Sequence, residues 1–499
     1  MTAIERTLPD EEATTLLGED IAAALRPGDV VALKGDLGAG KTTLARALVR
    51  ALAGDPGLDV PSPTFTLVQA YEARLPVAHY DLYRIGSPAE LDELGFAEAA
   101  GDGVVLVEWP EKAGDRMPAD AIVIELTELG DGRLARILPG AATARLERSL
   151  AIRDFLDRSG WRAAHRTYLT GDASARTYET VRRDGSALIL MNAPPLVLGP
   201  PVRGGKAYAE IAHTARSVSA FVAIDRLLHG AGFAVPEIFA TDLDGGFLLI
   251  ENLGPEPFLG SDGAPIAERY EAAGRLLADL HQRKWPGEAQ VTPGTMHVVP
   301  PFDRAAIMIE VDLLLDWYLP AIAGRQATTA ERVGYAEVWN RALDRLAGTE
   351  QSLLLRDYHS PNIIWRAEKT GNDRLGLVDF QDALIGPSAY DVASLAMDAR
   401  VTVSPEVEQR TIAAYVAARQ EAGAFNYETF SEAYALMAAQ RNSKILGLFV
   451  RLDRRDGKSA YLKHLPRIRD YLRRAFAHPA LTPLREFYDR HGLIEERSL

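Results

Sequence analysis

Gly35-Asp36-Leu37-Gly38-Ala39-Gly40-Lys41-Thr42 decides the fold of the first part of this 499-residue chain. The stretch fits the pattern G-x-x-x-x-G-K-[ST], with a strand-like apolar run before it and a helix-like run after it. Glycines let backbone N–H groups converge on a phosphate, and the start of the following helix adds partial positive charge. We therefore expect a nucleotide-binding loop in a parallel α/β sheet.

Polar residues around this loop predict a magnesium–nucleotide centre. Lys41 is expected to reach the β- and γ-phosphates, and the Thr42 hydroxyl to bind Mg²⁺. Asp81 and Glu108 each end an expected strand, over residues 77–82 and 104–108. Ligands of an open α/β sheet bind at that edge, so the two carboxylates are expected to bind metal or position water.

Residues 1 to about 140 resemble the TsaE (YjeE) family, the small ATPases of bacterial tRNA threonylcarbamoyladenosine synthesis. The resemblance rests on four stretches in order: GDLGAGKTT at 35–43, SPTFTL at 62–67, HYDLYR at 79–84 and VEWP at 107–110. It implies that Thr42 and Glu108 bind Mg²⁺ and that Asp81 is needed for hydrolysis. It also implies a nucleotide site that includes Gly35, Gly38, Gly40, Lys41, Thr43 and Trp109, a switch-like loop at 62–66, and work with TsaB and TsaD.

The charge is uneven along the chain. The whole sequence has a net charge of −14, and residues 1–140 hold 24 acidic against 12 basic side chains. Binding nucleic acid normally requires a basic face, so we expect this segment to bind protein partners, and those partners to bind the tRNA. Cysteine is absent, which excludes disulfides, thiolate metal sites and cysteine nucleophiles. With no apolar run of transmembrane length and no signal-peptide pattern, a cytoplasmic protein without membrane contact is expected.

The pattern of elements changes after residue 140. Strand–helix alternation gives way to a helical connector at 141–153, a small β-rich lobe at 154–255 and a helical lobe at 256–499. This predicts an α/β P-loop NTPase domain followed by a two-lobed α+β, protein-kinase-like domain.

The helical lobe contains a second phosphoryl-transfer motif. Asp357 and Asn362 lie five residues apart between two expected strands, and Asp379-Phe380 follows after the second. Transfer of a phosphoryl group to an alcohol needs a carboxylate beside the hydroxyl and oxygen ligands for Mg²⁺. Asp357 is therefore the expected catalytic base, and Asn362 and Asp379 the expected metal ligands.

The small lobe is expected to hold ATP, but it departs from the kinase pattern. Its third strand, at 187–192, has Met191 where kinases place a lysine. Gly171 lies in a loop that could cover the phosphates, Arg176 is the first candidate to replace the lysine, and Lys206 is a poorer one. Glu251 ends the strand that leads into a hinge able to bind adenine.

Residues from about 150 to the end resemble the aminoglycoside phosphotransferase-like superfamily, and within it the AmgK family of N-acetylmuramate and N-acetylglucosamine anomeric kinases. The supporting stretches include LMNAPP at 190–195, DWYLP at 316–320, LRDYHSPN at 355–362 and DFQDA at 379–383. The missing lysine also fits that family. The resemblance implies ATP-dependent phosphorylation of the sugar's anomeric hydroxyl in cell-wall recycling. Candidate acceptor-binding residues are Glu310, Asp316, Trp317, Tyr318, Arg441 and Asn442, and Asp391 is expected to brace the catalytic loop.

Three hypotheses remain open for the kinase-like half. It phosphorylates an amino sugar, it phosphorylates another small alcohol or an aminoglycoside, or it is a non-catalytic module that recruits the ATPase. The leading interpretation is a fused, two-enzyme chain whose active sites work independently.

Overall fold

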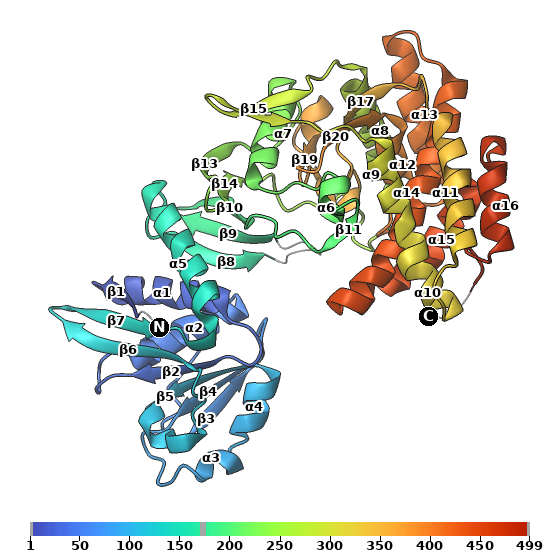
Figure 1. Ribbon diagram of the computed structural model, residues 1–499. Coiled ribbons are helices and arrows are strands. Elements are labelled where there is room, and N and C mark those ends of the chain that lie inside the picture. The colour runs from blue at the N-terminus through green and yellow to red at the C-terminus, as the bar shows by residue number, and fades with distance from the viewer. Residues whose placement is uncertain (1–2, 170–175, 497–499) are drawn as a thin grey trace. The chain divides into compact units, whose positions relative to one another are not determined.

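The computed structural model describes residues 3–169 and 176–496, which form two units. The first unit combines residues 1–194 with 238–252, and the second combines 195–237 with 253–499. Figure 1 labels the elements of both units. The first unit holds the glycine-rich loop, and the second holds the loop with Asp357.

The core of the first unit is a seven-stranded sheet of order β1-β7-β6-β2-β5-β4-β3. Strands β4, β5, β2 and β6 are parallel, while β3, β7 and β1 pair antiparallel with their neighbours. The expectation of a wholly parallel sheet is thus wrong at its edges, because short turns join β3 to β4 and β6 to β7. The strands are β1 (Ile4–Leu8), β2 (Val30–Lys34), β3 (Val68–Tyr71), β4 (Val77–Asp81), β5 (Val104–Glu108), β6 (Ile122–Leu129) and β7 (Gly132–Leu138).

Helices cover both faces of this sheet. Alternate residues of β5 explain why, since Leu106 packs into one core with α1 (Glu11–Ala24) and α2 (Lys41–Ala53), and Val107 into another with α4 (Phe96–Asp102). The short helix α3 (Glu90–Glu93) precedes α4. The expected start of α1 is confirmed: the Ala13 N–H donates to the Asp10 carboxylate at 2.8 Å.

The connector expected at 141–153 is the helix α5 (Thr143–Arg158), which contributes to two cores. Leu146 and Leu150 belong to the core of the P-loop sheet, whereas Phe155 and Leu156 pack under a second sheet. That sheet has the order β13-β14-β10-β9-β8 and is antiparallel throughout. Its strands are β8 (His165–Leu169), β9 (Thr177–Arg183), β10 (Ser186–Asn192), β13 (Ile238–Asp242) and β14 (Phe247–Glu251). The domain boundaries at 140, 153 and 255 stay a prediction.

A buried ion network fixes α1 against the second sheet. The Asp20 carboxylate of α1 accepts from Arg166 of β8 at 2.7 Å and from Arg153 of α5 at 2.9 Å. Arg166 also pairs with Glu179 of β9 at 2.6 Å. All four side chains are more than nine-tenths buried. Buried charges are tolerated only when paired, so this network specifies how the P-loop sheet and the second sheet meet.

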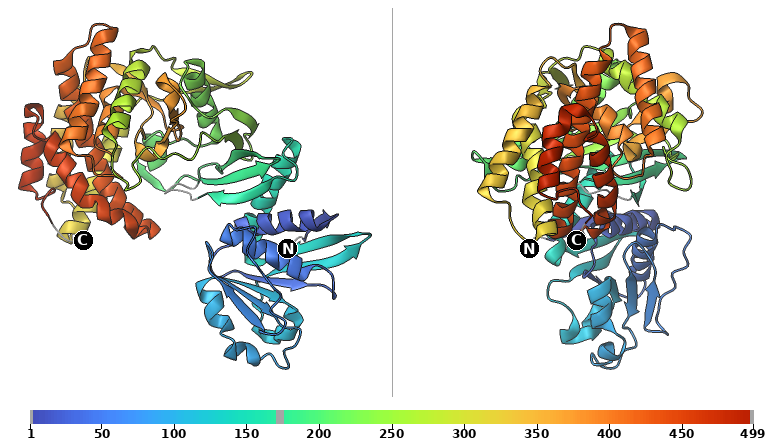
Figure 2. Two further views of the ribbon diagram at one scale, coloured as in Figure 1. Left: turned by 180° about the vertical axis from the view of Figure 1, so that it is seen from behind. Right: turned by 90° about the vertical axis from the view of Figure 1, so that its right-hand side faces the viewer.

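The second unit is mainly helical. Helix α14 (Tyr427–Asp456) lies at its centre and packs against α9, α12 and α15, as two views of the helices show (Figures 1 and 2). The remaining elements are β11 (Pro201–Arg203), β12 (Lys206–Ala207), α6 (Tyr208–Ile211), α7 (Val218–Gly230), α8 (Ala267–Gln282), β15 (Glu288–Thr292), β16 (Thr295–Val298), α9 (Arg304–Leu313), α10 (Leu319–Ala323), α11 (Thr329–Asp344), β17 (Gln351–Leu354), β18 (Ile363–Trp365), β19 (Leu375–Leu377), β20 (Leu384–Pro387), α12 (Ala389–Ala396), α13 (Pro405–Ala422), α15 (Leu465–Ala475) and α16 (Thr482–Arg490).

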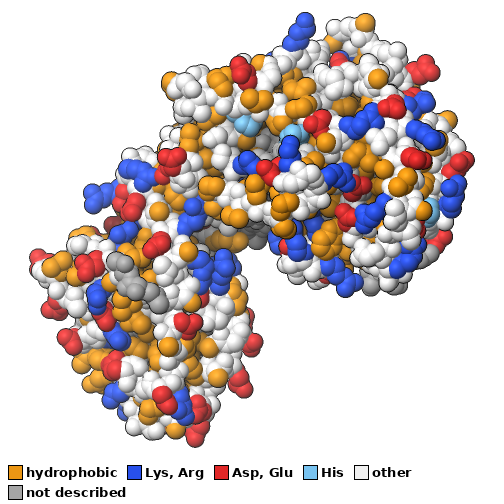
Figure 3. All heavy atoms as spheres, viewed as in Figure 1, with side chains coloured by type: hydrophobic (Ala, Val, Ile, Leu, Met, Phe, Trp, Pro, Cys, Tyr) orange, Lys and Arg blue, Asp and Glu red, His pale blue; other side chains and the backbone are white. Residues whose placement is uncertain are grey.

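Charged side chains of both signs lie on the surface of the molecule. Basic and acidic side chains are interspersed over the face seen in Figure 3. Among the described residues, no helix combines the length and apolar character that crossing a bilayer requires.

Candidate active sites

Parallel pairing brings the two predicted carboxylates of the first site together. Asp81 of β4 and Glu108 of β5 are direct register partners, and Glu108 also pairs with Leu33, just before the glycine-rich loop. Both carboxylates are buried. The predicted edge of the sheet therefore holds both acids beside the loop.

The glycine-rich loop has the backbone that its sequence predicts. Gly35, Gly38 and Gly40 have φ of 146°, 81° and 100°, a region that L side chains rarely adopt. A Cβ on Gly35 would lie 2.6 Å from the Leu126 carbonyl oxygen, whereas Gly38 and Gly40 face open space. Gly35 is thus required for packing, and the other two leave room for a ligand to approach the backbone.

The Lys41 side chain donates hydrogen bonds back to the backbone of the glycine-rich loop. Its ammonium donates to the carbonyl oxygens of Gly35 at 2.8 Å and Asp36 at 2.9 Å, and lies 3.8 Å from the centre of the Trp109 ring. Burial lowers the pKa of Lys41, against the opposing pull of Glu108 and Asp81. Since carbonyl oxygens are weak partners for a cation, incoming phosphate oxygens would replace them.

The other predicted groups line the same cavity of about 350 Å³, together with Thr43 and Trp109. The Thr42 hydroxyl donates to Glu108 at 2.9 Å. Asp81 accepts from the Ser62 hydroxyl at 2.8 Å and the Thr64 hydroxyl at 2.7 Å. The loop at 62–66 is therefore tied to the acid expected to support hydrolysis.

His79 is a residue that sequence reasoning missed. Its Nε2 lies 3.0 Å from the second oxygen of Glu108, and the ring is fully buried. The signal was present, because residues two apart on a strand share a face and His79 precedes Asp81 by two. The contact orients the carboxylate that also holds Thr42.

The second predicted centre is also assembled. The Asn362 amide donates to the Asp357 carbonyl oxygen at 2.8 Å and to the Asp379 carboxylate at 3.4 Å. Phe380 stacks on Phe221 of α7 with ring centres 4.7 Å apart, which anchors the segment carrying Asp379. The three groups of the motif thus converge, although 22 positions separate the first from the last in the sequence.

Buried carboxylates brace this catalytic loop. Asp391 accepts from the backbone N–H groups of Leu355 at 2.6 Å and Arg356 at 2.9 Å, as predicted. Asp398 accepts from the Ser360 N–H at 2.8 Å. Arg356 has φ of 69°, so the two bonds from Asp391 hold a strained turn in place. Burial raises the pKa of Asp391 to about 7, opposed by those same bonds.

Asp357, the predicted base, is surrounded by basic side chains. Burial alone would raise its pKa, but Arg441, His359 and Lys444 outweigh burial and hold the pKa well below the usual range. Arg441 lies 3.7 Å from the Asp357 carboxylate and donates to the Arg356 carbonyl oxygen at 3.0 Å. The carboxylate is half-buried and ionised at neutral pH.

The predicted nucleotide residues of the small lobe belong to the first unit. Arg176 directly precedes β9, and Glu251 ends β14, where it pairs in register with Leu188 of β10. Met191 of β10 is buried in the sheet. Gly171 lies outside the described residues. That Gly171, Arg176 and Glu251 bind the nucleotide stays a prediction.

Most of the predicted acceptor residues have hydrogen-bond or ion-pair partners in the protein, whereas Trp317 has none among the described residues. The Glu310 carboxylate is fully buried and pairs with Arg356, with Lys444 at 2.7 Å and with Gln440 at 2.9 Å. Asn442 donates to the Ala438 carbonyl oxygen at 2.9 Å. The other side chains lie in the π-helical turn Leu314–Tyr318, where Asp316 pairs with Arg332 at 2.7 Å and Tyr318 is buried beside Trp317. Direct contacts of these residues with an acceptor stay predictions.

The predicted metal ligands, Thr42 and Glu108 at one site and Asn362 and Asp379 at the other, offer hard oxygen donors, which suit Mg²⁺. Among the described residues there is no group of three or more histidine and acidic side chains able to hold a metal alone. Ions at Thr42 and Glu108, or at Asn362 and Asp379, would therefore share their remaining coordination with phosphates and water.

These two centres define a P-loop NTPase domain and a kinase-like phosphotransferase domain on one chain. The family model described as "Threonylcarbamoyl adenosine biosynthesis protein TsaE" matches residues 8–136, and the model described as "Phosphotransferase enzyme family" matches residues 165–425.

The curated relatives fall into two groups, amino-sugar kinases and TsaE proteins, which correspond to the two domains. An N-acetylmuramate/N-acetylglucosamine kinase of Caulobacter vibrioides is 33% identical, over 71% of this chain and 99% of its own length. A protein of the same name from Pseudomonas putida is 31% identical, over 61% of this chain and 82% of its own. A TsaE of Rickettsia conorii is 40% identical, over 31% of this chain and 87% of its own. The chain belongs to the phosphotransferase enzyme family, and its first domain belongs to the TsaE family.

Proposed function

We propose that this chain is a bifunctional enzyme. Its second half transfers the γ-phosphate of ATP to the anomeric hydroxyl of N-acetylmuramate or N-acetylglucosamine. Its first half hydrolyses ATP in support of tRNA threonylcarbamoyladenosine modification. The observation that carries the kinase proposal is the convergence of Asp357, Asn362 and Asp379, in a chain similar to named amino-sugar kinases.

In the kinase reaction Asp357 orients the anomeric hydroxyl and accepts its proton. The hydroxyl oxygen forms a bond to the γ-phosphorus as the bond to the β–γ bridging oxygen breaks, and ADP leaves. Asn362 and Asp379 would hold Mg²⁺, which neutralises charge on the phosphates. The ionised state of Asp357 supports this role, because the base is available at neutral pH without a prior proton loss.

In the ATPase reaction Lys41 and the loop backbone bind the phosphates, and Thr42 with Glu108 would hold Mg²⁺. Asp81 positions the attacking water, with Ser62 and Thr64 linking it to the neighbouring loop. TsaB- and TsaD-type proteins are the proposed partners, and the acidic segment supports docking on protein rather than on tRNA. The cytoplasm is the proposed compartment.

Phosphotransfer by the full chain tests the kinase proposal. Purified protein with Mg²⁺-ATP and N-acetylmuramate should give a sugar phosphate whose ³¹P–¹H coupling places phosphorus on the anomeric carbon, and Asp357→Asn should lose it. Product with an aminoglycoside or another alcohol, but with neither amino sugar, would favour the second hypothesis. Absence of transfer to every acceptor would favour a recruitment module, a hypothesis motivated by Met191 in place of a lysine.

A further inference from the structure

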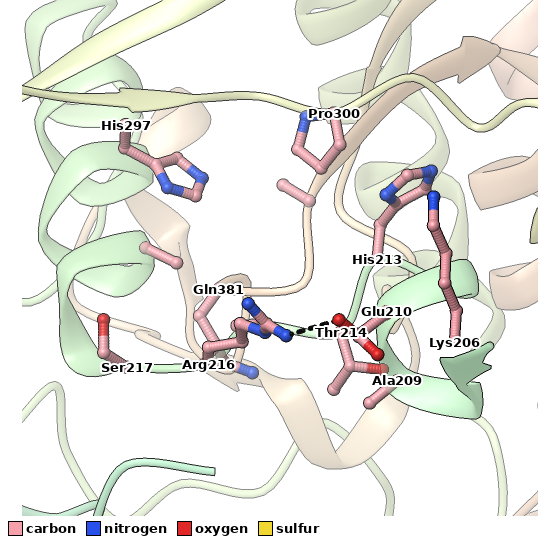
Figure 4. Close-up of a pocket in the computed structure, with 13 residues that line it drawn as sticks. Lys206, Ala209, Glu210, His213, Thr214, Arg216, Ser217, His297, Pro300 and Gln381 are labelled. Atoms are coloured by element: carbon pink, nitrogen blue, oxygen red, sulfur yellow. Dashed lines mark hydrogen bonds and ion pairs between the residues drawn. The ribbon is translucent and has the colours of Figure 1, made fainter. Parts of the chain in front are cut away.

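A cavity of about 410 Å³ lies within the second unit, beside the segment that carries Asp379. Segment 206–217, which includes α6 and leads into α7, forms one wall. His297 of β16 and Gln381 form the others, and Figure 4 shows their side chains around the hollow. The cavity is thus built by parts of the chain that are far apart in the sequence.

Gln381 lines this cavity and carries a buried acceptor oxygen. Its side-chain nitrogen donates to the Asp379 carboxylate at 2.9 Å, which fixes the direction of the amide. The oxygen Oε1 has no hydrogen-bond partner among the described residues, although the side chain is only 5% exposed. Leaving a buried acceptor unpaired is costly, so this oxygen is suited to a ligand hydroxyl or amide N–H.

A chain of hydrogen bonds links the cavity lining to the predicted reacting groups. Gln381 contacts Asp379, Asp379 contacts Asn362, and Asn362 contacts the Asp357 backbone. The wall segment is fixed to the same loop, because the Ala215 N–H donates to the Asp382 carboxylate at 2.6 Å. A ligand held here is therefore positioned by residues that also position the metal ligand.

The charge of the lining favours an anion. Arg216 pairs with Glu210 at 3.0 Å, as the dashed line in Figure 4 marks, and His213 contacts Asp303 at 3.2 Å. The Lys206 ammonium has no ion-pair partner in the part of the chain that the structure describes. Lys206 is exposed, so its ammonium is open to an anionic ligand at the rim of the cavity.

We propose that this cavity is the acceptor subsite, where Lys206 binds a carboxylate on the sugar and Gln381 Oε1 accepts a hydrogen bond from a hydroxyl or amide N–H. N-acetylmuramate carries a lactyl carboxylate, and N-acetylglucosamine has a hydroxyl at that position. Lys206 therefore favours the carboxylated sugar, whereas Gln381 serves both. The inference rests on the proposed kinase function for its choice of ligands.

Calorimetric binding of both sugars to the full chain, with steady-state kinetics on the same samples, tests the subsite. Lys206→Met should weaken binding of N-acetylmuramate and raise its KM about tenfold, the loss expected for one charge-assisted bond. It should leave N-acetylglucosamine within about twofold. Lys206→Arg should restore binding, Lys284→Met is the control for a lysine outside the cavity, and Gln381→Met should weaken binding of both sugars.

The outcomes distinguish failure of the subsite from failure of the proposed kinase function. Equal losses for the two sugars in Lys206→Met, or unchanged binding of both in Gln381→Met, would overturn the subsite. Wild-type protein that binds N-acetylmuramate through Lys206 but phosphorylates neither sugar would keep the subsite and refute the proposed kinase function. Wild-type protein that binds neither sugar would overturn the subsite whatever acceptor the kinase uses.

Discussion

The P-loop domain and the kinase-like half of this molecule differ in where they place basic side chains. In the P-loop domain, Lys41 follows the glycines directly and lies in the cavity that the loop forms. In the small lobe, the strand that carries a lysine in kinases has the buried Met191. The catalytic loop of the second unit instead holds its charges as buried pairs, such as Arg356 with Glu310.

This difference shows how each centre is constructed. The P-loop site depends on a short continuous motif and on strand register, so a few local residues define it. The kinase-like site depends on carboxylates and arginines from distant helices, which hold a strained loop in shape. Substitutions at the first site should change contacts with the nucleotide directly. Many substitutions at the second site should instead act by displacing the catalytic loop.

The largest expected effect is loss of phosphotransfer in Asp357→Asn. The amide cannot accept the hydroxyl proton, so kcat should fall by about 10²–10⁴-fold. Phosphate release by the P-loop site should be unchanged, as an assay without sugar measures. A kcat close to wild type would exclude Asp357 as the base.

Lys41→Met should reduce ATP hydrolysis by the first site by about 10²–10³-fold, the usual cost of losing one preorganised electrostatic contact. Phosphate release without sugar, with Asp357→Asn as background, measures it. Retained hydrolysis would show that another cation binds the phosphates.

Arg166→Met should destabilise the first unit by about 3–5 kcal/mol, because it leaves Glu179 buried without its ion-pair partner and leaves Asp20 with Arg153 alone. Chemical denaturation followed by tryptophan fluorescence measures this loss. Arg183 of the same sheet is half-buried, pairs with its exposed neighbour Asp184 and donates to the Gly160 carbonyl oxygen, so Arg183→Met is the control and should cost much less, because it leaves no charge buried without a partner. Equal effects of the two substitutions would contradict a structural role for the network.

Arg441→Met should move the acid limb of the pH–kcat/KM profile upward. Arg441 favours the ionised form of Asp357, so its removal raises the carboxylate pKa and protonates the base at higher pH. Arg441→Lys retains the charge and should shift the limb less, while thermal unfolding checks that both variants fold. An unmoved limb would assign it to another group.

Local chemistry made much of this structure predictable. The glycine-rich loop, the Asp10 cap, the paired strand ends at Asp81 and Glu108, and the bracing role of Asp391 follow from motifs and from strand and helix patterns. The antiparallel strands β1, β3 and β7 of the first sheet were not expected from the sequence, because the tendency to form a strand depends strongly on the packing around it.

The residues that sequence reasoning missed interact across long stretches of chain. Asp20 and Arg166 are 146 positions apart, and Glu310 and Arg356 are 46 apart. No local pattern distinguishes such charges from solvated ones. The sequence therefore did not indicate that the Glu310 carboxylate contacts Arg356, Lys444 and Gln440; its predicted contact with the acceptor stays a prediction.

The central claim is that one chain carries two separately working ATP centres, and a single reaction series tests it. Sugar phosphate and free phosphate are measured together for wild type, Lys41→Met and Asp357→Asn, with Mg²⁺-ATP and N-acetylmuramate. The account predicts that Lys41→Met loses phosphate release but keeps sugar phosphate, and that Asp357→Asn does the reverse. Sugar phosphate that falls together with phosphate release in Lys41→Met would contradict it.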